Sequence, residues 1–163
     1  MEIKIAITSG YFDPIHIGHI KYLKAAKKFA NYLVVIVNND QQAKLKKGQS
    51  FMSFEERCSI IKELKCVDRV IESIDEDRTV SKTLKFVVDL IKKENPSKEV
   101  EFIFANGGDY NTNKKCPEED TCNDLGIKSI YGVGGEKIQS SSDLIKKAKN
   151  GIWFRTKKNR KWN

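Results

Sequence analysis

The sequence has no apolar run long enough to span a membrane. Its longest runs, such as residues 33–37, have the length of a strand and fall far short of the roughly 20 residues that a spanning helix needs. The first residues also lack the charged and then apolar layout of a signal peptide. The chain has 163 residues, of which 39% are hydrophobic, enough for one packed core. We therefore expect a soluble, cytoplasmic protein without a membrane partner.

Cysteine and histidine are scarce, and their spacing does not fit a zinc finger. The four cysteines, at positions 58, 66, 116 and 122, form no Cys-x-x-Cys pair, and there are only two histidines. We interpret the cysteines as reduced thiols, with a disulfide between Cys116 and Cys122 as the alternative. The sequence also contains no internal repeat and no low-complexity segment.

Negative charge is in the minority, and part of the positive excess lies in one short segment. The formal net charge is +8. After a domain of residues 1–149, residues 150–163 form a basic C-terminal tail with five cationic side chains and no acid: Arg155, Lys157, Lys158, Arg160 and Lys161. Such a tail is typical of a solvated end or of an arm that docks on a partner. Nucleic-acid binding is the alternative, and we favour it less.

Short runs of branched apolar side chains alternate with segments of helical periodicity. They predict strands at residues 3–8, 33–37, 67–72, 100–104 and 127–131, and helices at residues 18–29, 53–64, 79–93 and 140–149. This alternation predicts an α/β fold, a Rossmann-like doubly wound five-stranded parallel sheet with helices on both faces. Ligands bind such sheets at the carboxyl ends of the strands. The unusual turns of this sequence follow the first, second, fourth and fifth strands.

Both histidines lie in one segment, Gly10-Tyr-Phe-Asp-Pro-Ile-His-Ile-Gly-His19, directly after the first strand. His16 and His19 stand where a helix begins, so both rings can face a helix N-terminus, whose free N–H groups bind phosphate. Gly10 and Gly18 allow the backbone to approach a ligand closely. Imidazole N–H groups beside a phosphate suit nucleotidyl transfer, in which charge develops on phosphate oxygens. A zinc site formed by the histidines and Asp13 is the alternative.

The motifs of competing reaction classes are absent. The sequence contains no Gly-x-Ser-x-Gly segment of a serine hydrolase, no Gly-x-x-x-x-Gly-Lys-Ser phosphate loop and no Gly-x-Gly-x-x-Gly dinucleotide turn.

The pattern Gly-x-Phe-Asp-x-x-His-x-Gly-His is similar to the signature of the cytidylyltransferase-like nucleotidyltransferases, which share His-x-Gly-His with class I aminoacyl-tRNA synthetases. The resemblance implies transfer of a nucleoside monophosphate from CTP or ATP, with Mg²⁺ on the triphosphate, and a homodimer. It implies His16 and His19 as catalytic residues and nucleotide contacts from the same segment: Gly10, Tyr11, Phe12, Asp13 and Gly18. No Lys-Met-Ser-Lys-Ser segment is present, so we do not expect tRNA aminoacylation.

The resemblance continues after the second strand. Residues 44–48 resemble a segment in which a lysine, here Lys46, contacts substrate phosphate as a third catalytic residue. Two further side chains, Asp40 and Arg57, are expected to support the site. The alternative for Arg57 is an ion pair with Asp68.

The glycines after the fourth strand resemble a second known segment. Residues 107–110 are similar to the Gly-Gly-Asp-Tyr segment of the adenylyltransferase domain of ADP-heptose synthases, in which a lysine stands at the position of Asn106. This similarity implies nucleotide contacts from Gly107 and Asp109.

Three consecutive serines resemble the Ser-Thr-Thr segment that opens the family's last helix. The resemblance implies phosphate contacts from Ser140, Ser141 and Ser142. Glycerol-3-phosphate cytidylyltransferases carry an arginine where this chain has Gly135, and Lys137 could supply that charge to the nucleotide.

We therefore predict a nucleotidyltransferase that uses CTP or ATP and a phosphorylated sugar, polyol or amino alcohol, with a sugar or polyol phosphate favoured. The alternative is a non-catalytic nucleotide-binding or nucleic-acid-binding protein that uses the basic tail.

Overall fold

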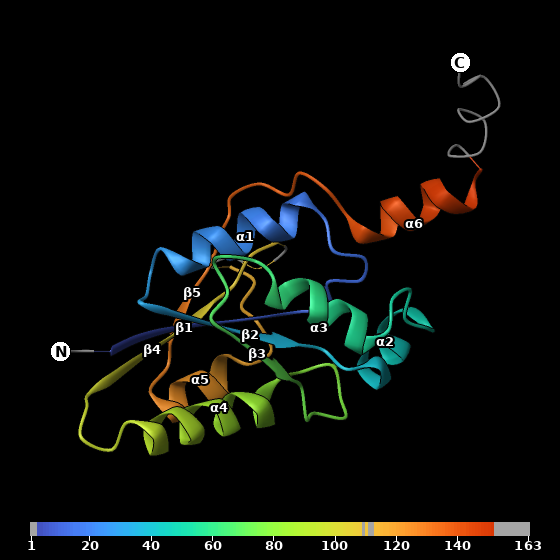
Figure 1. Ribbon diagram of the computed structural model, residues 1–163. Coiled ribbons are helices and arrows are strands. Elements are labelled where there is room, and N and C mark those ends of the chain that lie inside the picture. Colours follow the sequence, from blue (N-terminus) through green and yellow to red (C-terminus); the bar gives the residue numbers. More distant parts are fainter. Residues whose placement is uncertain (1–2, 109, 111–112, 152–163) are drawn as a thin grey trace.

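The computed structural model describes residues 3–108, 110 and 113–151, and in it five parallel strands form one sheet (Figure 1). The spatial order is β3-β2-β1-β4-β5, so the strand order reverses between β1 and β4. The strands are β1 (Ile3–Gly10), β2 (Tyr32–Val37), β3 (Arg69–Glu72), β4 (Val100–Ala105) and β5 (Lys128–Ile130). The predicted Rossmann-like parallel sheet is confirmed.

Helices cover both faces of the sheet. They are α1 (Ile17–Lys27), α2 (Asp40–Lys47), α3 (Phe54–Lys62), α4 (Ser81–Glu94), α5 (Glu119–Leu125) and α6 (Ser141–Lys149). In Figure 1, α4 and α5 lie below the sheet and α1 lies above it, while α6 extends away from the body of the domain. The predicted elements match these bounds to within two residues at either end.

The strands send alternate side chains into two cores, because successive residues of a strand point to opposite faces. Ile5 and Ile7 of β1 pack with α4 and α5, whereas Ala6 packs with Leu23 of α1 and Ile61 of α3. The continuous apolar run of β2 is buried on both faces, as expected of a central strand in a parallel sheet.

Two helices were not predicted. The sequence predicts only a turn after the second strand, but α2 begins there and is held by a capping box between Asn39 and Gln42. Gln42 is buried and donates hydrogen bonds to the carbonyls of Asp77 and Thr79. The polar loop expected after β4 contains α5, which ends at Gly126 with a φ of 68°. Both helices lack an apolar stripe, so their periodicity gave no signal.

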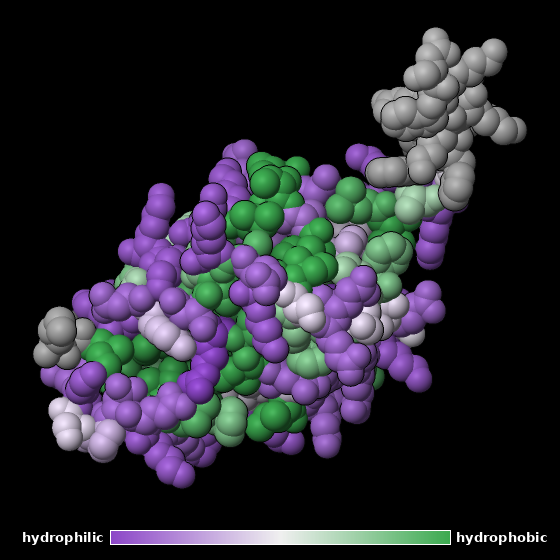
Figure 2. Space-filling view, in the orientation of Figure 1, coloured by the Kyte–Doolittle hydropathy of each residue, from purple (hydrophilic) through white to green (hydrophobic). Residues whose placement is uncertain are grey.

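The disulfide considered between Cys116 and Cys122 is wrong, because all four cysteines are free thiols. Burial raises the pKa of the Cys122 thiol to about 12. Among the described residues, no helix is long and apolar enough to cross a membrane. The visible face in Figure 2 is largely hydrophilic with scattered apolar patches. Residues 152–163 of the basic tail, with its five cationic side chains, lie outside the described residues, so the predicted role of the tail stays a prediction.

Candidate active site

A cleft of about 650 Å³ opens at the carboxyl ends of β1 and β4, where the strand order reverses. Its walls are the segment from β1 to α1, the loops after β4 and β5, and the start of α6. This is where parallel α/β sheets bind ligands, because the loops diverge there and leave a crevice.

Most of the predicted site residues line this cleft. The structure brings together Gly10, Tyr11, Phe12, His16, Gly18, His19, Lys46, Gly107, Lys137, Ser140, Ser141 and Ser142. Asp13, Asp40 and Arg57 are not in the lining, and Asp109 lies outside the described residues.

The two imidazoles cap the first turn of α1. His16 is the N-cap residue, and its Nδ1 accepts a hydrogen bond from the backbone N–H of Gly18 at 3.1 Å. The Nδ1 of His19 accepts from the backbone N–H of His16 at 3.2 Å. These N–H groups are therefore not open to phosphate, which corrects the expectation of a free helix N-terminus. A neutral ring that accepts at Nδ1 carries its proton on Nε2.

The surroundings keep both rings in the neutral form. Burial, first, and then the neighbouring His16 and the charges of Lys47 and Lys137 together lower the pKa of His19 to about 3. Burial, first, and then the charges of Lys137 and Lys47 lower the pKa of His16. At neutral pH each Nε2–H is thus a donor on an uncharged ring.

Phe12 explains why the segment begins with glycine. Its φ is 52°, a value that residues other than glycine rarely adopt, and its ring is buried. A Cβ on Gly10 would lie 2.9 Å from Cζ of Phe12, so only glycine leaves room for this ring. The ring also meets His19 edge to face, with 5.1 Å between centroids, and so restricts the tilt of the imidazole.

Asp13 has a structural role in place of the predicted nucleotide contact. Its buried carboxylate accepts hydrogen bonds from the backbone N–H groups of Phe51 and Met52, at 2.8 and 2.6 Å. The Asp13 carbonyl accepts from Nζ of Lys47 at 2.7 Å. The residue therefore joins the histidine segment to the α2–α3 loop. This use of its carboxylate also argues against the zinc site considered for Asp13, and no group of three or more metal-binding side chains occurs in the described part of the chain.

Arg57 is not in the cleft lining, but its hydrogen bonds join two segments that are. Its fully buried guanidinium donates to the carbonyls of Tyr11 and Asn38, both at 2.7 Å. It also pairs with Asp40 at 2.6 Å. The alternative pair with Asp68 is wrong, because Asp68 binds Nζ of Lys27 instead. The arginine thus connects the ends of β1 and β2.

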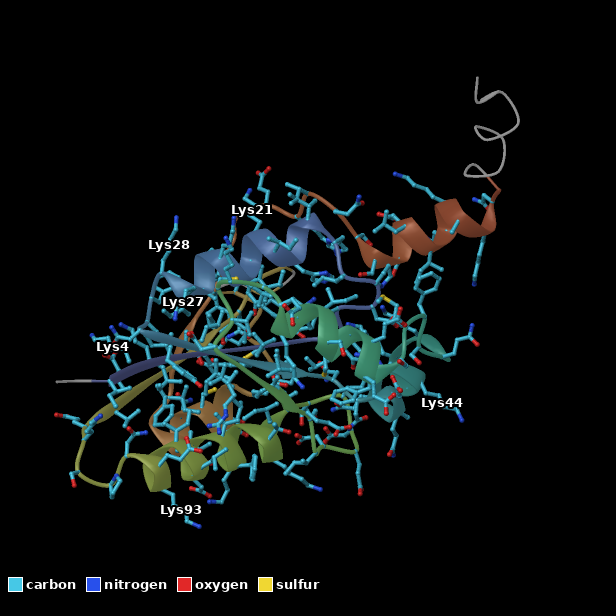
Figure 3. All side chains as sticks on the ribbon, in the orientation of Figure 1. Lys4, Lys21, Lys27, Lys28, Lys44 and Lys93 are labelled. Atoms are coloured by element: carbon cyan, nitrogen blue, oxygen red, sulfur yellow. The ribbon has the colours of Figure 1, made fainter. Side chains whose placement is uncertain are left out.

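The cleft carries an excess of positive charge. Its described lining contains the cations Lys21, Lys46, Lys47, Arg78 and Lys137 and the acids Glu118 and Glu136. Nζ of Lys46 lies 4.3 Å from the ring centroid of Tyr11. Figure 3 shows Lys44, on the same helix, pointing away from the body. The side chains of α2 therefore divide between cleft and solvent, and the polyanionic phosphates of a nucleotide match this lining.

The far wall comes from the loops after β4 and β5 and from α6. A Cβ on Gly107 would lie 2.7 Å from the carbonyl oxygen of Val133 and 2.8 Å from the ring of Tyr22, so this contact needs glycine. Ser140 caps α6 by accepting from the N–H of Asp143. Ser141 donates to the carbonyl of Pro14 at 2.9 Å. This bond ties the start of α6 to the histidine segment.

The comparisons with known proteins agree with this geometry. The sequence profile of the family described as cytidylyltransferase-like matches residues 7–158. The chain belongs to this family. The predicted resemblance, and with it an enzyme of the nucleotidyltransferase type, is confirmed.

Curated relatives in this family match over one part of their length. The chain is 34% identical over 151 residues to the "Bifunctional protein HldE" of Blochmanniella floridana, and the matched region covers 87% of this chain. It is 32% identical over 153 residues to the protein of the same name from Escherichia coli (strain K12 / DH10B). The chain spans 27% of the length of these relatives.

Solved structures of similar fold include a lipopolysaccharide core biosynthesis protein from Thermoplasma volcanium. It matches with a TM-score of 0.58 and 25% identity over 85% of this chain and 98% of that chain. A bifunctional NMN adenylyltransferase/ADP ribose pyrophosphatase from Francisella tularensis matches with a TM-score of 0.63 and 16% identity. It covers 91% of this chain and 42% of that chain, and this likeness shows the fold alone.

Sequence reasoning missed several residues of this family member's cleft, among them Tyr22, Lys47, Arg78 and Glu118. Lys47 stands beside the predicted Lys46, and the resemblance that selected Lys46 did not show that its neighbour also reaches the cleft. Arg78 follows β3, the one strand whose following loop gave no motif. Glu118 precedes the unpredicted α5, so a residue there had no assigned place in the fold.

Proposed function

We propose that the protein transfers a nucleoside monophosphate from CTP or ATP to the phosphate of a small sugar or polyol phosphate and releases pyrophosphate. The observation that carries the proposal is the orientation of the histidine pair in a basic cleft. Both rings accept at Nδ1 and leave Nε2–H as the remaining donor. Family membership supports the same reaction class.

The reaction is a displacement at the α-phosphorus. An oxygen of the acceptor phosphate forms a bond to this phosphorus, and the bond from the phosphorus to the bridging oxygen of the β-phosphate breaks. The electron pair of that bond leaves with pyrophosphate. The Nε2–H groups of His16 and His19 donate to the phosphate oxygens that gain charge. No covalent enzyme intermediate is needed, because positioning and charge stabilisation supply the catalysis.

The rest of the cleft provides for both substrates. Lys137 and the start of α6, with Ser141 and Ser142, bind the β- and γ-phosphates, since a helix N-terminus favours anions. Lys46 attracts the acceptor phosphate. Lys47 is near both groups, since its charge acts on both histidine rings and its Nζ is 5.9 Å from the centroid of the Tyr11 ring.

Mg²⁺ fits this cleft as a partner of the triphosphate. Of the two carboxylates in the described lining, Glu118 already accepts from the N–H of Val80, which leaves Glu136 to hold the ion, and Mg²⁺ in nucleotide enzymes is held largely by phosphate oxygens and water. Bound in this way, the ion neutralises charge on the phosphates. The protein groups named above perform the positioning and donate the hydrogen bonds.

Two similarities favour a sugar or polyol phosphate as the acceptor. The Gly-Gly-Asp-Tyr segment resembles that of ADP-heptose synthases, whose substrate is a sugar. The Thermoplasma volcanium structure is described as a lipopolysaccharide core biosynthesis protein. We also propose a homodimer, which light scattering of the purified chain would test.

A pyrophosphate-release screen tests the proposed function. Each of the four ribonucleoside triphosphates is combined with Mg²⁺ and a panel of sugar, polyol and amino-alcohol phosphates. We expect turnover with ATP or CTP and at least one sugar or polyol phosphate, and loss of turnover when EDTA removes the metal. Silence across the whole panel, with nucleotide binding retained, would overturn the proposal and favour a nucleotide sensor.

A further inference from the structure

The Tyr11 hydroxyl is buried in the cleft wall without a protein partner. Among the described residues, its Oη is one of the few buried side-chain oxygens with no hydrogen bond. A buried hydroxyl without a partner costs free energy, so such groups in a substrate cleft mark places where a ligand completes the hydrogen bond. Tyr11 lines the cleft together with Arg78 and Glu118, neither of which has a role in the proposed transfer step.

The charges of the cleft divide it into two neighbourhoods. Lys47 and Lys137 act on the pKa values of the two histidines. A different set acts on Tyr11, whose pKa is raised by burial, lowered by Arg78 and raised by Tyr110 and Glu118. The groups that act on the histidines and those that act on the Tyr11 hydroxyl therefore differ, and Lys46 and Lys47, over the Tyr11 ring, lie where the two sets meet.

Two of the residues around Tyr11 are fixed in place by backbone contacts. Glu118 is only 6% exposed, and its Oε1 accepts from the N–H of Val80 at 3.0 Å, which joins the start of α5 to the start of α4. Nη2 of Arg78 donates to the carbonyl of Leu45 at 2.8 Å, which joins the β3–α4 loop to α2. The side chains of Tyr11, Arg78 and Glu118 thus come from three separate segments of the chain that line the same cleft.

The chemistry of this group suits hydroxyls better than an ammonium group. A quaternary or primary ammonium binds aromatic faces and carboxylates, but Nζ of Lys46 already lies over the Tyr11 ring. Lys46 and Arg78 would also repel a second cation. A neutral hydroxyl, in contrast, can donate to the Glu118 carboxylate and accept from Tyr11 or Arg78.

We propose that Tyr11, Arg78 and Glu118 form the subsite for the hydroxyl-bearing carbon chain or ring of the acceptor phosphate. This inference rests on the proposed function. The acceptor phosphate lies near Lys46 and Lys47, between the two neighbourhoods, and its hydroxyls extend to the Tyr11 Oη and the Glu118 carboxylate. Tyr11 is thereby moved from the predicted nucleotide contacts to the acceptor contacts, and the three residues select sugar or polyol phosphates over amino-alcohol phosphates.

The test uses Tyr11→Phe and Glu118→Gln, two variants that keep the shape of each side chain. The glutamine keeps an oxygen that can accept from the N–H of Val80. The control is Tyr32→Phe, a partly buried tyrosine at the start of β2 that is not in the cleft lining. KM is measured for the acceptor and for the nucleotide with the best substrate pair from the screen.

We expect Tyr11→Phe to raise the acceptor KM about fivefold and Glu118→Gln to raise it about tenfold or more, with the nucleotide KM changed less than twofold. Tyr32→Phe is expected to change neither constant. Acceptors that lack a single hydroxyl should bind the wild type more weakly. For one of these acceptors, Tyr11→Phe should leave the KM unchanged, because the hydroxyl that contacts Tyr11 is already missing.

Three results would overturn the inference. The nucleotide KM could rise while the acceptor KM stays constant, which would place the ribose of the nucleotide at Tyr11. Amino-alcohol phosphates could be preferred by the wild type, or the variants could leave both constants unchanged. If the wild type releases no pyrophosphate with any acceptor, the proposed function is refuted instead. The subsite is then tested separately, by calorimetric titration of sugar phosphates into the wild type and Tyr11→Phe with a non-hydrolysable triphosphate present.

Discussion

The rings of His16 and His19 are stacked, with centroids 3.8 Å apart and planes inclined by 25°. Each ring uses Nδ1 to cap a backbone N–H of α1. The two candidate catalytic groups are therefore positioned by the backbone of the helix that they cap, and four predictions follow from the structure around them.

Replacing His16 separates its catalytic role from its capping role. Asparagine is a strong N-cap residue but has no donor at the Nε2 position. We expect His16→Asn to lower kcat by about 10²- to 10³-fold with little loss of stability. His16→Ala should lower turnover at least as much and also cost about 1 kcal/mol of helix capping. Pyrophosphate release and urea unfolding measure the two effects, and near-normal turnover in His16→Asn would refute the catalytic role.

Gly18 fixes the position of the His16 ring, because its backbone N–H donates to Nδ1 of that ring. A Cβ at this position would lie 2.9 Å from Cε1 of His16, and the ring would have to shift. A misplacement on the order of 1 Å can cost about 10²-fold in rate, so we expect that loss of kcat for Gly18→Ala. Ile17→Ala is the control, because Ile17 is 59% exposed and outside the cleft lining. Equal activity of both variants would contradict the role of Gly18.

The lowered histidine pKa values set the pH dependence. His19 has a folded-state pKa of about 3 against 6.5 for an unperturbed histidine, so protons bind more readily to the unfolded chain. The stability that comes from the neutral, capping ring is fully present above about pH 6.5 and is lost as the pH falls toward 3. NMR titration of the two rings checks this expectation.

The same shift predicts the activity profile. Because the pKa of His19 is about 3, kcat/KM should show no titration of this ring between pH 6 and pH 8, and the lowered pKa of His16 moves its titration below the usual 6.5. A bell-shaped profile with an acid limb near pH 6.5 would show that the rings titrate normally and would contradict this environment.

Removal of the Arg57 guanidinium should destabilise the fold. Arg57→Met leaves the carbonyls of Tyr11 and Asn38 without their donor in a buried region, and we expect the free energy of unfolding to fall by about 2–4 kcal/mol. The half-exposed Asp40 contributes less, since water screens that pair. Arg69→Met is the control, because its pair with Glu94 lies at the surface, where water screens the two charges. Similar losses in both variants, measured by urea unfolding, would contradict this account.

The sheet could be predicted because buried parallel strands are continuous apolar runs, and residues 33–37 are all buried. Helix α2 could not be predicted from periodicity, because its stability comes from the buried side chain of Gln42 and from bonds to a loop 35 and 37 residues away. The spacing of Asn39 and Gln42, a capping-box pattern, was the available signal.

The site was predictable where one motif carries it and unpredictable where the fold brings distant residues together. The sequence placed His16 and His19 at a helix start, where they lie. It assigned Asp13 to the nucleotide, because a motif does not tell whether a carboxylate faces a ligand or the backbone of a loop 38 residues away. Arg78 and Glu118 reach the cleft through the packing of α4 and α5, which no local pattern records.

The capping role of the histidines changes what their presence means in related sequences. A relative that lost its chemistry would still be under selection to keep His-x-x-His, because the first turn of α1 is satisfied by these two rings. Retention of the motif across such relatives therefore reports on folding as well as on turnover. Positions that face only the substrates are the ones whose drift would reveal an inactive descendant.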